Sequence, residues 1–451
     1  MSEIALSVGF LSLGCPKNLV DSQIMAESLL DQGFTLAPSP ERADVIIVNT
    51  CAFIEDARGE SLDAIEAACE QKAAGGCQAV LVAGCMPQRY QSEIQDALPS
   101  VDAFIGLDRI DEAGDIIHQL IASKEKVYAV TRKAERVFAP KSTVVFSSGA
   151  HAFLKIAEGC NHGCTFCAIP GIRGKHRSRA LHELVQEAHL LLQKGFRELD
   201  LIAQDIMAYG NDLTPATSLD ELLQAIATSE GEYWIRLLYG YPSLLTDALL
   251  ETVAAYPAIC PYLDIPIQHS HPDMLRAMRR AGTAQAAQNM PTRIRTYLPD
   301  ATLRTTALVG FPGETDAHFE HLREYLAAAQ FDHLGVFCFS PEAGTPAANM
   351  PNQVPTEVAA SRQAMLMQDQ QKRVRKALRQ SKGKHARVLI EAPGKKTGTL
   401  RARHAGQAPD VDGVVWINNP LPSWKPGTFA DVIYTGSRGY DLLAQPANAR
   451  L

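Results

Sequence analysis

The stretch EGCNHGCTFC at residues 158–167 carries the most specific pattern in this sequence. Cys160, Cys164 and Cys167, the central set, have the spacing C-x3-C-x2-C directly after a β-type run. Three thiolates on one loop can hold three corners of a metal centre. Iron–sulfur clusters usually have four cysteine ligands, so this spacing favours a cluster with one open iron. A zinc site completed by His162, or three core cysteines, are the alternatives.

Strand and helix patterns alternate on the C-terminal side of this loop. Helices are expected, for example, at 181–194 and 218–228. Six units are too few for an eight-unit barrel but suit an open one, with its chemistry at the carboxyl ends of the strands. The pattern therefore predicts a partial (β/α)6 barrel with strands near 152–157, 199–203, 234–238, 262–267, 303–309 and 333–339.

The first part of the chain also alternates short apolar runs with helical patterns, which predicts an α/β domain with a parallel sheet. Runs at 8–13, 45–48 and 79–83 end just before three further cysteines, the N-terminal set Cys15, Cys51 and Cys85. Ligands of open α/β sheets bind beyond the carboxyl ends of the strands. We therefore expect these three thiols to lie in a binding position.

The last part of the chain changes character. A helical pattern begins at Pro355 and runs to about Ser381, with Gly383 as a stop. Beyond it, turn signals separate four β-type runs, which predicts a small antiparallel β-barrel with strands at 386–391, 414–418, 428–434 and 440–443. The predicted division is an N-terminal domain at 1–130, a linker at 131–149, a barrel with its C-terminal helix at 150–383 and a small barrel at 384–451.

Composition excludes several classes of protein. The chain has 451 residues, of which 46% are hydrophobic and 21% charged, as in globular proteins rather than disordered or fibrous ones. The net charge of −7 argues against a protein built only to coat nucleic acid. Residues 372–451 nevertheless hold fifteen Lys and Arg against five Asp and Glu. This basic region indicates either RNA contact or an ordinary solvated face.

The sequence also predicts where the protein works. Apolar runs are too short for a membrane span, and MSEIALSVGF has no basic segment typical of a secretory signal. We expect a cytoplasmic protein without membrane contact. In that reducing compartment ten cysteines are unsuited to a disulfide framework, so metal ligation is the first interpretation.

The C-x3-C-x2-C loop after the first strand of a partial barrel resembles the radical S-adenosylmethionine superfamily. The resemblance implies a [4Fe–4S] cluster on Cys160, Cys164 and Cys167, with S-adenosylmethionine chelating the fourth iron. An electron passed to the cofactor then yields a radical that removes hydrogen from an unreactive carbon. The cofactor carries that chemistry, and the protein holds and shields it.

Further motifs resemble the methylthiotransferases of this superfamily. They are SLGCPKNLVDS at 12–22, VNTCAFIEDARGES at 48–61 and GCMPQRY at 84–90. The resemblance implies that Cys15, Cys51 and Cys85 bind a second [4Fe–4S] cluster. It also implies that the C-terminal barrel is a TRAM-like module, as found in RNA-modifying enzymes.

Residues near the cysteines separate two branches of this family. Pro16-Lys17, Phe53-Ile54, Glu60-Ser61 and Cys167-Ala-Ile-Pro170 resemble the branch that modifies ribosomal protein S12. The implied reaction adds a methylthio group to the β-carbon of an aspartate in that protein. The alternative is the same chemistry on an adenosine of tRNA. A zinc-bearing RNA-binding adaptor is the alternative from a different class.

Several polar residues are candidates for contact with the cofactor or substrate. Gln204, Gln268, Gly310 and Glu314 lie at or after predicted strand ends and are expected to bind S-adenosylmethionine; local turn or strand-end roles are the alternative. The loop after the central set adds Arg173, Lys175, Arg177 and Arg179, which would attract an acidic group. The expected partner is S12, free or on the small ribosomal subunit, with RNA contact through the basic region. The motifs identify neither the reductant nor the sulfur donor.

Overall fold

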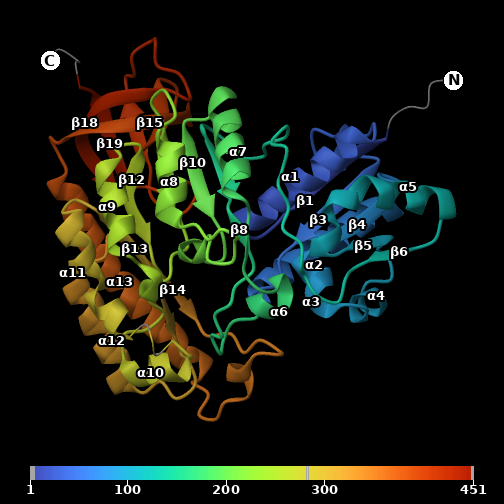
Figure 1. Ribbon diagram of the computed structural model, residues 1–451, viewed down its shortest axis with the longest axis horizontal. Helices are drawn as coiled ribbons and strands as arrows, with labels where there is room; N and C mark the ends of the chain where they lie inside the picture. Colours follow the sequence, from blue (N-terminus) through green and yellow to red (C-terminus); the bar gives the residue numbers. More distant parts are fainter. Residues whose placement is uncertain (1–5, 281, 283, 448–451) are drawn as a thin grey trace.

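The chain forms three main sheets in sequence order, which the computed structural model describes over residues 6–280, 282 and 284–447 (Figure 1). Two are six-stranded, and the third is a closed barrel. The predicted fold class is confirmed. The first five residues of the predicted N-terminal domain, and the last four of the predicted C-terminal barrel, lie outside the described residues.

The N-terminal sheet has the order β2-β1-β3-β4-β5-β6 and is parallel throughout. Its buried side chains alternate between two cores, so α1 and α5 cover one face, and α2, α3 and α4 cover the other. The strands are β1 (Ser7–Ser12), β2 (Thr35–Leu36), β3 (Val45–Thr50), β4 (Ala79–Gly84), β5 (Ala103–Ile105) and β6 (Val127–Ala129). The helices are α1 (Pro16–Asp31), α2 (Glu55–Ala73), α3 (Cys85–Tyr90), α4 (Glu93–Ala97) and α5 (Ala113–Ser123), with 3-10 turns η1 (Pro40–Arg42) and η2 (Leu107–Glu112).

The central sheet is the predicted open barrel of six parallel strands, in the order β14-β13-β12-β11-β10-β7. Leucine-rich helix faces pack on its outer side; α8, for example, starts with a capping box between Ser218 and Glu221. The strands are β7 (His151–Lys155), β10 (Glu198–Ile202), β11 (Trp234–Leu237), β12 (Ile259–Asp264), β13 (Thr302–Val309) and β14 (His333–Cys338), and β8 (Ala157–Glu158) pairs with β9 (Arg177–Ser178). The helices are α6 (Ile169–Arg173), α7 (Leu181–Gln193), α8 (Leu219–Ala227), α9 (Asp247–Ala255), α10 (Pro272–Ala277), α11 (Ala284–Tyr297), α12 (Asp316–Ala329) and α13 (Thr356–Gln380), with 3-10 turns η3 (Ile206–Ala208), η4 (Pro242–Leu244) and η6 (Pro346–Asn349).

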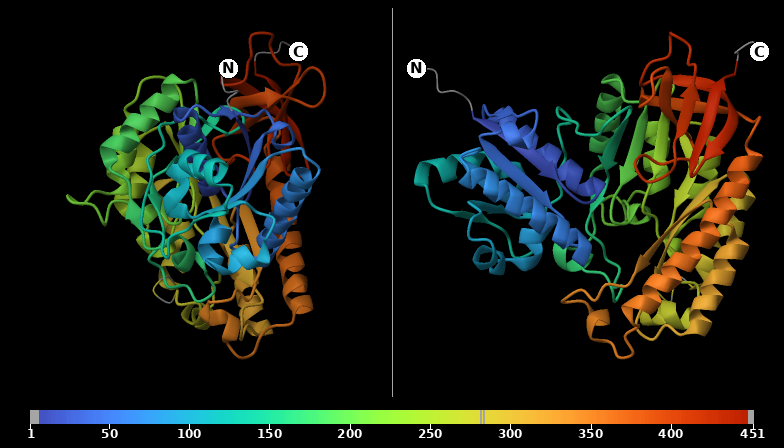
Figure 2. Two further views of the ribbon diagram at one scale, coloured as in Figure 1. Left: turned by 90° about the vertical axis from the view of Figure 1, so that its right-hand side faces the viewer. Right: turned by 180° about the vertical axis from the view of Figure 1, so that it is seen from behind.

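The N-terminal domain lies against the barrel through α1 (Figure 2). Between β6 and β7 the described chain forms no helix or strand. Glu27 of α1 accepts the backbone N–H groups of Lys141 and Thr143, both at 2.8 Å. Ser142 donates to Glu187 of α7 at 2.9 Å. The linker is therefore fixed between the two domains rather than being a free tether.

The C-terminal barrel closes in the order β15-β16-β17-β19-β18. Its pairings are antiparallel except that of β17 with β19, which is parallel, so the expectation of a wholly antiparallel barrel needs this one correction. β19 leaves the hairpin with β18 and closes the barrel against β17, whose direction it shares. The strands are β15 (His385–Pro393), β16 (Thr399–His404), β17 (Val415–Asn418), β18 (Phe429–Arg438) and β19 (Asp441–Pro446).

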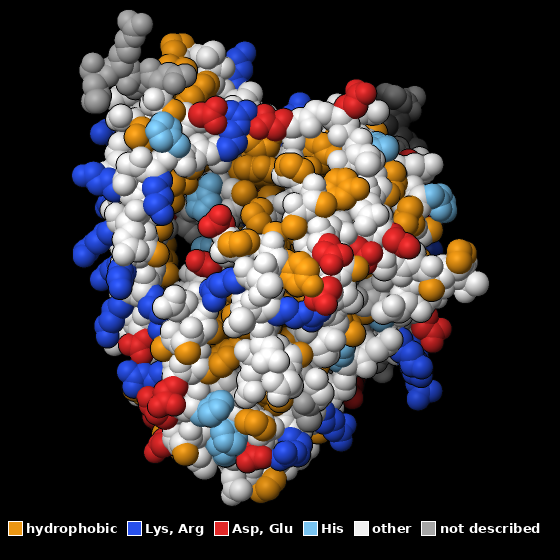
Figure 3. All heavy atoms as spheres, turned by 60° about the vertical axis from the view of Figure 1, so that its left-hand side comes forward, with side chains coloured by type: hydrophobic (Ala, Val, Ile, Leu, Met, Phe, Trp, Pro, Cys, Tyr) orange, Lys and Arg blue, Asp and Glu red, His pale blue; other side chains and the backbone are white. Residues whose placement is uncertain are grey.

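Helix α13 leads into this barrel and forms an amphipathic layer. Ala359, Arg362, Leu366 and Gln370 are its buried residues, at helical spacing. Its last turns expose Lys and Arg, and Figure 3 shows such side chains gathered along the edge of the molecule where α13 runs. None of the described helices is long and apolar enough to cross a membrane.

Buried ion pairs fasten the C-terminal barrel to the first strands of the central barrel. The Glu198 carboxylate of β10 accepts from Arg236 Nε at 2.5 Å and from Arg403 Nη1 of β16 at 3.1 Å. Arg403 also donates to Glu391 at 2.6 Å. Burial raises the pKa of Glu198, but the charges of Arg236 and Arg403 outweigh it and lower the pKa to about 2.

This attachment predicts acid sensitivity. The folded pKa of Glu198 lies below the value of ~4.3 for an unfolded glutamate, so its ion pairs stabilise the fold above about pH 4.3. That stabilisation, of about 3 kcal/mol, is lost as the pH falls toward 2. We expect unfolding of the full chain, followed by tryptophan fluorescence, to show this loss, and Glu198→Gln to show less of it. Glu232→Gln, which breaks an exposed pair with Arg387 at the same interface, should change stability little.

Candidate functional site

The central set lies in the loop between β8 and α6. Gly159 opens this loop with φ +78°, and a Cβ there would lie 2.1 Å from the carbonyl oxygen of Lys175. Only glycine fits this position. The backbone N–H of Cys160 donates to the carbonyl of Gly174 at 3.1 Å, so the loop is held at both of its ends.

The N-terminal set follows three neighbouring parallel strands, as expected. Cys15 follows β1 and precedes α1, Cys51 follows β3, and Cys85 follows β4 as the first residue of α3. Gly14 has φ +84°, and a Cβ there would lie 2.6 Å from the Cβ of Cys51. Two of the cysteine-bearing turns therefore touch, and glycine permits the approach.

The chemistry of both sets fits a bound metal cluster. All ten cysteines are free. Burial is the main reason why the pKa of Cys160 is raised to about 11 and those of Cys85 and Cys167 to about 12, and the charges of the other thiols in each set contribute to these shifts. Such thiols are protonated at neutral pH unless a cation stabilises the thiolate. Iron provides that stabilisation, because metal binding requires and favours the deprotonated sulfur.

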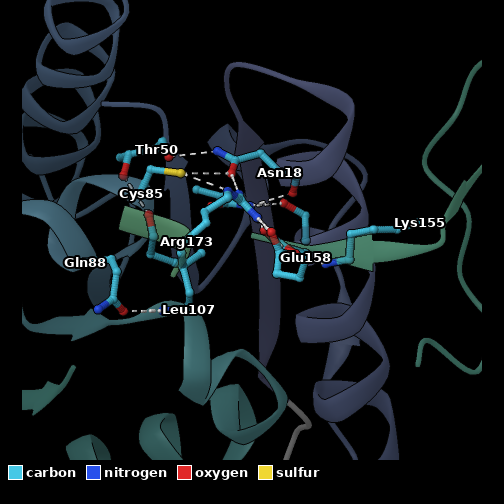
Figure 4. A network of polar contacts seen from close by, with 12 residues as sticks. Asn18, Thr50, Cys85, Gln88, Leu107, Lys155, Glu158 and Arg173 are labelled. Carbon is cyan, nitrogen blue, oxygen red and sulfur yellow. Dashed lines mark hydrogen bonds and ion pairs between the residues drawn. The ribbon is translucent and has the colours of Figure 1, made fainter. Parts of the chain in front are cut away.

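Arg173 of α6 links the N-terminal set to the strand that carries the central set (Figure 4). Its Nη2 donates to Asn18 Oδ1 at 2.6 Å, to Asp21 Oδ2 at 2.9 Å and to Cys85 Sγ at 3.5 Å. Its Nη1 donates to both carboxylate oxygens of Glu158, at 2.9 and 3.0 Å. One fully buried guanidinium therefore contacts a cysteine of one set and the residue two positions before the other set.

Two more buried cations complete this network. Lys155 Nζ donates to Asp21 Oδ1 at 2.6 Å and to Glu158 Oε2 at 3.1 Å. Burial raises the pKa of Glu158, but Arg173 and Lys155 outweigh it and lower the pKa overall. Lys17, two residues after Cys15, is buried with its Nζ 3.3 Å from the centre of the Tyr239 ring. The region between the two sets thus holds three basic side chains around the carboxylates of Asp21 and Glu158, and burial lowers the pKa of Lys17.

The His162 side chain has partners other than a metal centre, which argues against it as the fourth ligand of a zinc site. Its Nε2 lies 2.6 Å from Asp205 Oδ2, and its ring stacks on Tyr241 with centroids 3.6 Å apart. Arg280 lies over the same tyrosine ring at 4.2 Å and donates to Cys164 Sγ at 3.5 Å. These contacts fix the side chains beside the cysteine loop. They favour a cluster whose fourth metal position lacks a protein ligand over a zinc site with four protein ligands.

The candidate cofactor residues have different surroundings. Gln204 donates to Glu158 at 2.7 Å, while its buried Oε1 has no hydrogen-bond partner among the described residues, as expected of a group that awaits a ligand. Gln268 has φ +67°, an uncommon conformation outside glycine. Glu314 accepts from the Gly310 N–H at 3.0 Å and from Arg362 at 2.7 Å. Local structure therefore already occupies the Glu314 carboxylate.

The network also contains residues that the sequence did not single out. Asn18, Asp21 and Glu158 stand inside motifs that we quoted for their cysteines, and Lys155 lies in a predicted strand, but none of the four was given a role. Of the four basic loop residues that we considered, Arg173 alone has a described hydrogen bond to a cysteine of either set. Arg179 pairs with Glu187 at 2.6 Å, and Arg177 donates to the backbone carbonyl of Arg173 at 3.1 Å.

Three family models match the chain. Residues 7–106 match an uncharacterized protein family, UPF0004, residues 154–326 match the radical SAM superfamily, and residues 383–446 match the TRAM domain. The fold and the central cysteine loop thus define a radical S-adenosylmethionine enzyme that carries a TRAM domain.

Two curated relatives resemble the chain over almost its whole length. The ribosomal protein uS12 methylthiotransferases RimO of Geobacter sulfurreducens and Trichlorobacter lovleyi are each 41% identical to it, over 99% of both chains. The chain belongs to the ribosomal protein uS12 methylthiotransferase family.

Solved structures with the same fold are much more distant in sequence. The radical S-adenosylmethionine methyltransferase TsrM of Kitasatospora setae has a TM-score of 0.56 and 14% identity, covering 76% of this chain and 77% of its own. The cobalamin-dependent enzyme OxsB has a TM-score of 0.51 and 11% identity, covering 81% of this chain and 55% of its own. At these identities the similarity concerns the fold alone.

Proposed function

We propose that this protein transfers a methylthio group to the β-carbon of an aspartate of ribosomal protein S12. The observation that carries the proposal is the buried contact of Arg173 with Cys85 and with Glu158, beside the central set. It brings two three-cysteine sites to one region, as a reaction with two sulfur-ligated centres requires. Family membership favours the ribosomal protein over the alternative substrate, a tRNA adenosine.

Two [4Fe–4S] clusters and S-adenosylmethionine serve this reaction. Cys160, Cys164 and Cys167 hold one cluster and leave an iron open for the cofactor, and Cys15, Cys51 and Cys85 hold the other. When bound, these groups supply the electron, the hydrogen abstraction and the methylated sulfur. The residues assigned to the cofactor are Gln204, Gln268, Gly310 and Glu314, of which Glu314 would act indirectly, because its carboxylate holds the Gly310 turn and Arg362.

The chain's own side chains prepare this region. Arg173 brings positive charge next to Cys85, and the Cys15 thiolate favours the charged form of Lys17, although burial lowers the pKa of Lys17 overall; both cations offset the negative charge of ligating thiolates. Asn18 and Glu158 hold the Arg173 guanidinium in one orientation. Arg173 and Glu158 are almost inaccessible to solvent, so water is kept from this side of the reacting groups.

The test compares the two candidate substrates. Anaerobically reconstituted enzyme is given S-adenosylmethionine and a reductant with free S12, with small ribosomal subunits or with tRNA. We expect a mass gain of one methylthio group on an aspartate of S12 and none on tRNA. A gain on tRNA alone, or deoxyadenosine formation without a gain on S12 in either form, would contradict the proposal.

The basic end of α13 contacts ribosomal RNA when S12 is presented on the subunit. Arg375 and Arg379 are exposed and lie one helical turn apart. Phosphate contacts of this kind give salt-dependent affinity. We expect Arg375→Gln/Arg379→Gln to slow modification of subunit-bound S12 about 10-fold at physiological salt and to leave free S12 unaffected.

A matched control replaces two exposed basic residues of the linker, as Arg132→Gln/Lys133→Gln. This variant should modify both forms of S12 at the normal rate. Equal rates of all three proteins on subunits would show that α13 makes no productive RNA contact.

These roles assign one task to each part of the chain. Residues 1–130 hold the second cluster, 131–149 form the linker, 150–383 form the radical core, and 384–451 form the TRAM module. The enzyme acts in the cytoplasm, where its ribosomal substrate is found.

A further inference from the structure

A third group of metal-ligand side chains lies apart from both cysteine sets, at the N-terminal ends of α10 and α12. His271, Asp273 and His318 each offer one ligand atom, and these atoms lie within 4.8 Å of one another. The rings of His271 and His318 have centroids 4.4 Å apart, and the His321 ring lies 5.0 Å from that of His271. Figure 3 shows histidine side chains gathered on this part of the surface.

We propose that His271, Asp273 and His318, the histidine site, bind a divalent transition-metal ion of the zinc class. Two imidazoles and one carboxylate match the ligand preferences of zinc and leave a fourth position for water. Calcium and magnesium prefer oxygen ligands throughout and are not expected to bind. The Asp273 side chain is 57% exposed and that of His271 is 26% exposed, so an ion reaches the site from solvent.

Local structure holds the two rings near each other before an ion arrives. His271 is the N-cap of α10, and its Nδ1 accepts from the Asp273 N–H at 3.2 Å. His318 forms a capping box with Thr315, whose N–H donates to His318 Nδ1, also at 3.2 Å. These bonds are long, so an ion competes with weak partners for the ring nitrogens.

The same ion would join two loops of the barrel. His271 follows the β12 loop that contains Gln268, and His318 follows the β13 loop that contains Gly310 and Glu314. A bound metal therefore cross-links the two loops and reduces their independent movement. Its effect on S-adenosylmethionine rests on the proposed function, whereas the binding site itself does not.

The capping roles suggest variants that remove the ligands and keep the helices. Asparagine is a favourable N-cap residue, and glutamine serves at the third position of a capping box. The variant His271→Asn/His318→Gln therefore removes both imidazoles and keeps both caps. The control His182→Asn/His189→Gln makes the same changes on α7, away from the site.

The experiment uses the full-length protein with its clusters reconstituted, freed of loose metal by a chelator and then given one equivalent of zinc. Zinc-edge X-ray absorption should show nitrogen and oxygen neighbours at about 2.0–2.1 Å with an imidazole signature. Competition with a chromophoric chelator should show affinity at least about 100-fold weaker in the double variant and normal affinity in the control. Magnesium in excess should displace no zinc.

Three results would overturn the proposal. They are sulfur neighbours at about 2.3 Å as the main zinc shell, unchanged zinc affinity in the double variant, and no stoichiometric binding by the normal protein. Each is readable whether or not methylthio transfer occurs, so this test can fail without touching the proposed function.

Discussion

Replacing Arg173 by methionine is expected to abolish methylthio transfer and to lower the free energy of unfolding by about 3–5 kcal/mol. Arg173 contacts Asp21, Glu158, Asn18 and Cys85 from a fully buried position. Without it, Lys155 would be the one described cation still in direct ion pairs with Asp21 and Glu158. Breaking a buried ion pair from one side is strongly destabilising, because it leaves uncompensated charge away from water. Denaturant unfolding of the full chain, with an activity assay on S12, measures both effects.

Two further variants separate charge from general damage. Arg173→Lys keeps the charge, but one ammonium cannot reach Glu158 and also Asp21 and Cys85 as the two terminal guanidinium nitrogens do, so it should recover part of the stability and less of the activity. Arg177→Met removes a nearby arginine whose Nη2 donates to the backbone carbonyls of Arg136 and Arg173 but to no described carboxylate or cysteine of the network, so it should be much closer to normal in both respects. If Arg173→Met is as stable and active as Arg177→Met, the network has no role in joining the two sites.

Replacing Cys15, Cys51 and Cys85 together by alanine is expected to remove methylthio transfer completely while leaving the cleavage of S-adenosylmethionine in place. The three cysteines lie at neighbouring strand ends and are the assigned ligands of one cluster. The central set belongs to a different loop and keeps its own backbone contacts. Deoxyadenosine should therefore still form in the variant, without any mass gain on S12.

The N-terminal domain supplies a control of the same chemistry. Cys69 and Cys77 pack in its apolar core with no assigned ligand role, so Cys69→Ala/Cys77→Ala should retain transfer. If the triple variant still transfers the methylthio group, a second cluster on these three cysteines is not needed for the reaction. Loss of deoxyadenosine formation in the triple variant would mean that the two sites do not act separately.

The parallel character and the main strands of both large sheets follow from patterns visible in the sequence, whereas the strand order came from the structure. Runs such as VIIVNT and AVLVAG are apolar throughout because both faces of the parallel sheet are covered, and Cys51 and Cys85 come directly after them. The prediction of the C-terminal barrel was less complete, because it did not include the strand β16. Its sequence TLRARH has two arginines, of which Arg403 is buried in ion pairs with Glu391 and Glu198. Burial of that charge depends on partners distant in the chain.

The contacts between the two cysteine sites could not be predicted from the sequence for the same reason. Arg173 and Asp21 are separated by 152 residues, and no local pattern pairs them. Cysteine spacing could place each set because its members follow strand ends or share one loop. The network arises only when α1 packs against the barrel, so the buried partners of Arg173 required the three-dimensional structure.

The central claim is that two separate cysteine sets each hold a four-iron cluster. Iron and acid-labile sulfide per chain, measured after anaerobic reconstitution, test it most directly. The account predicts about eight iron with matching sulfide, falling to about four when Cys15, Cys51 and Cys85 are replaced. About four iron in the unaltered protein, or zinc without iron, would contradict it.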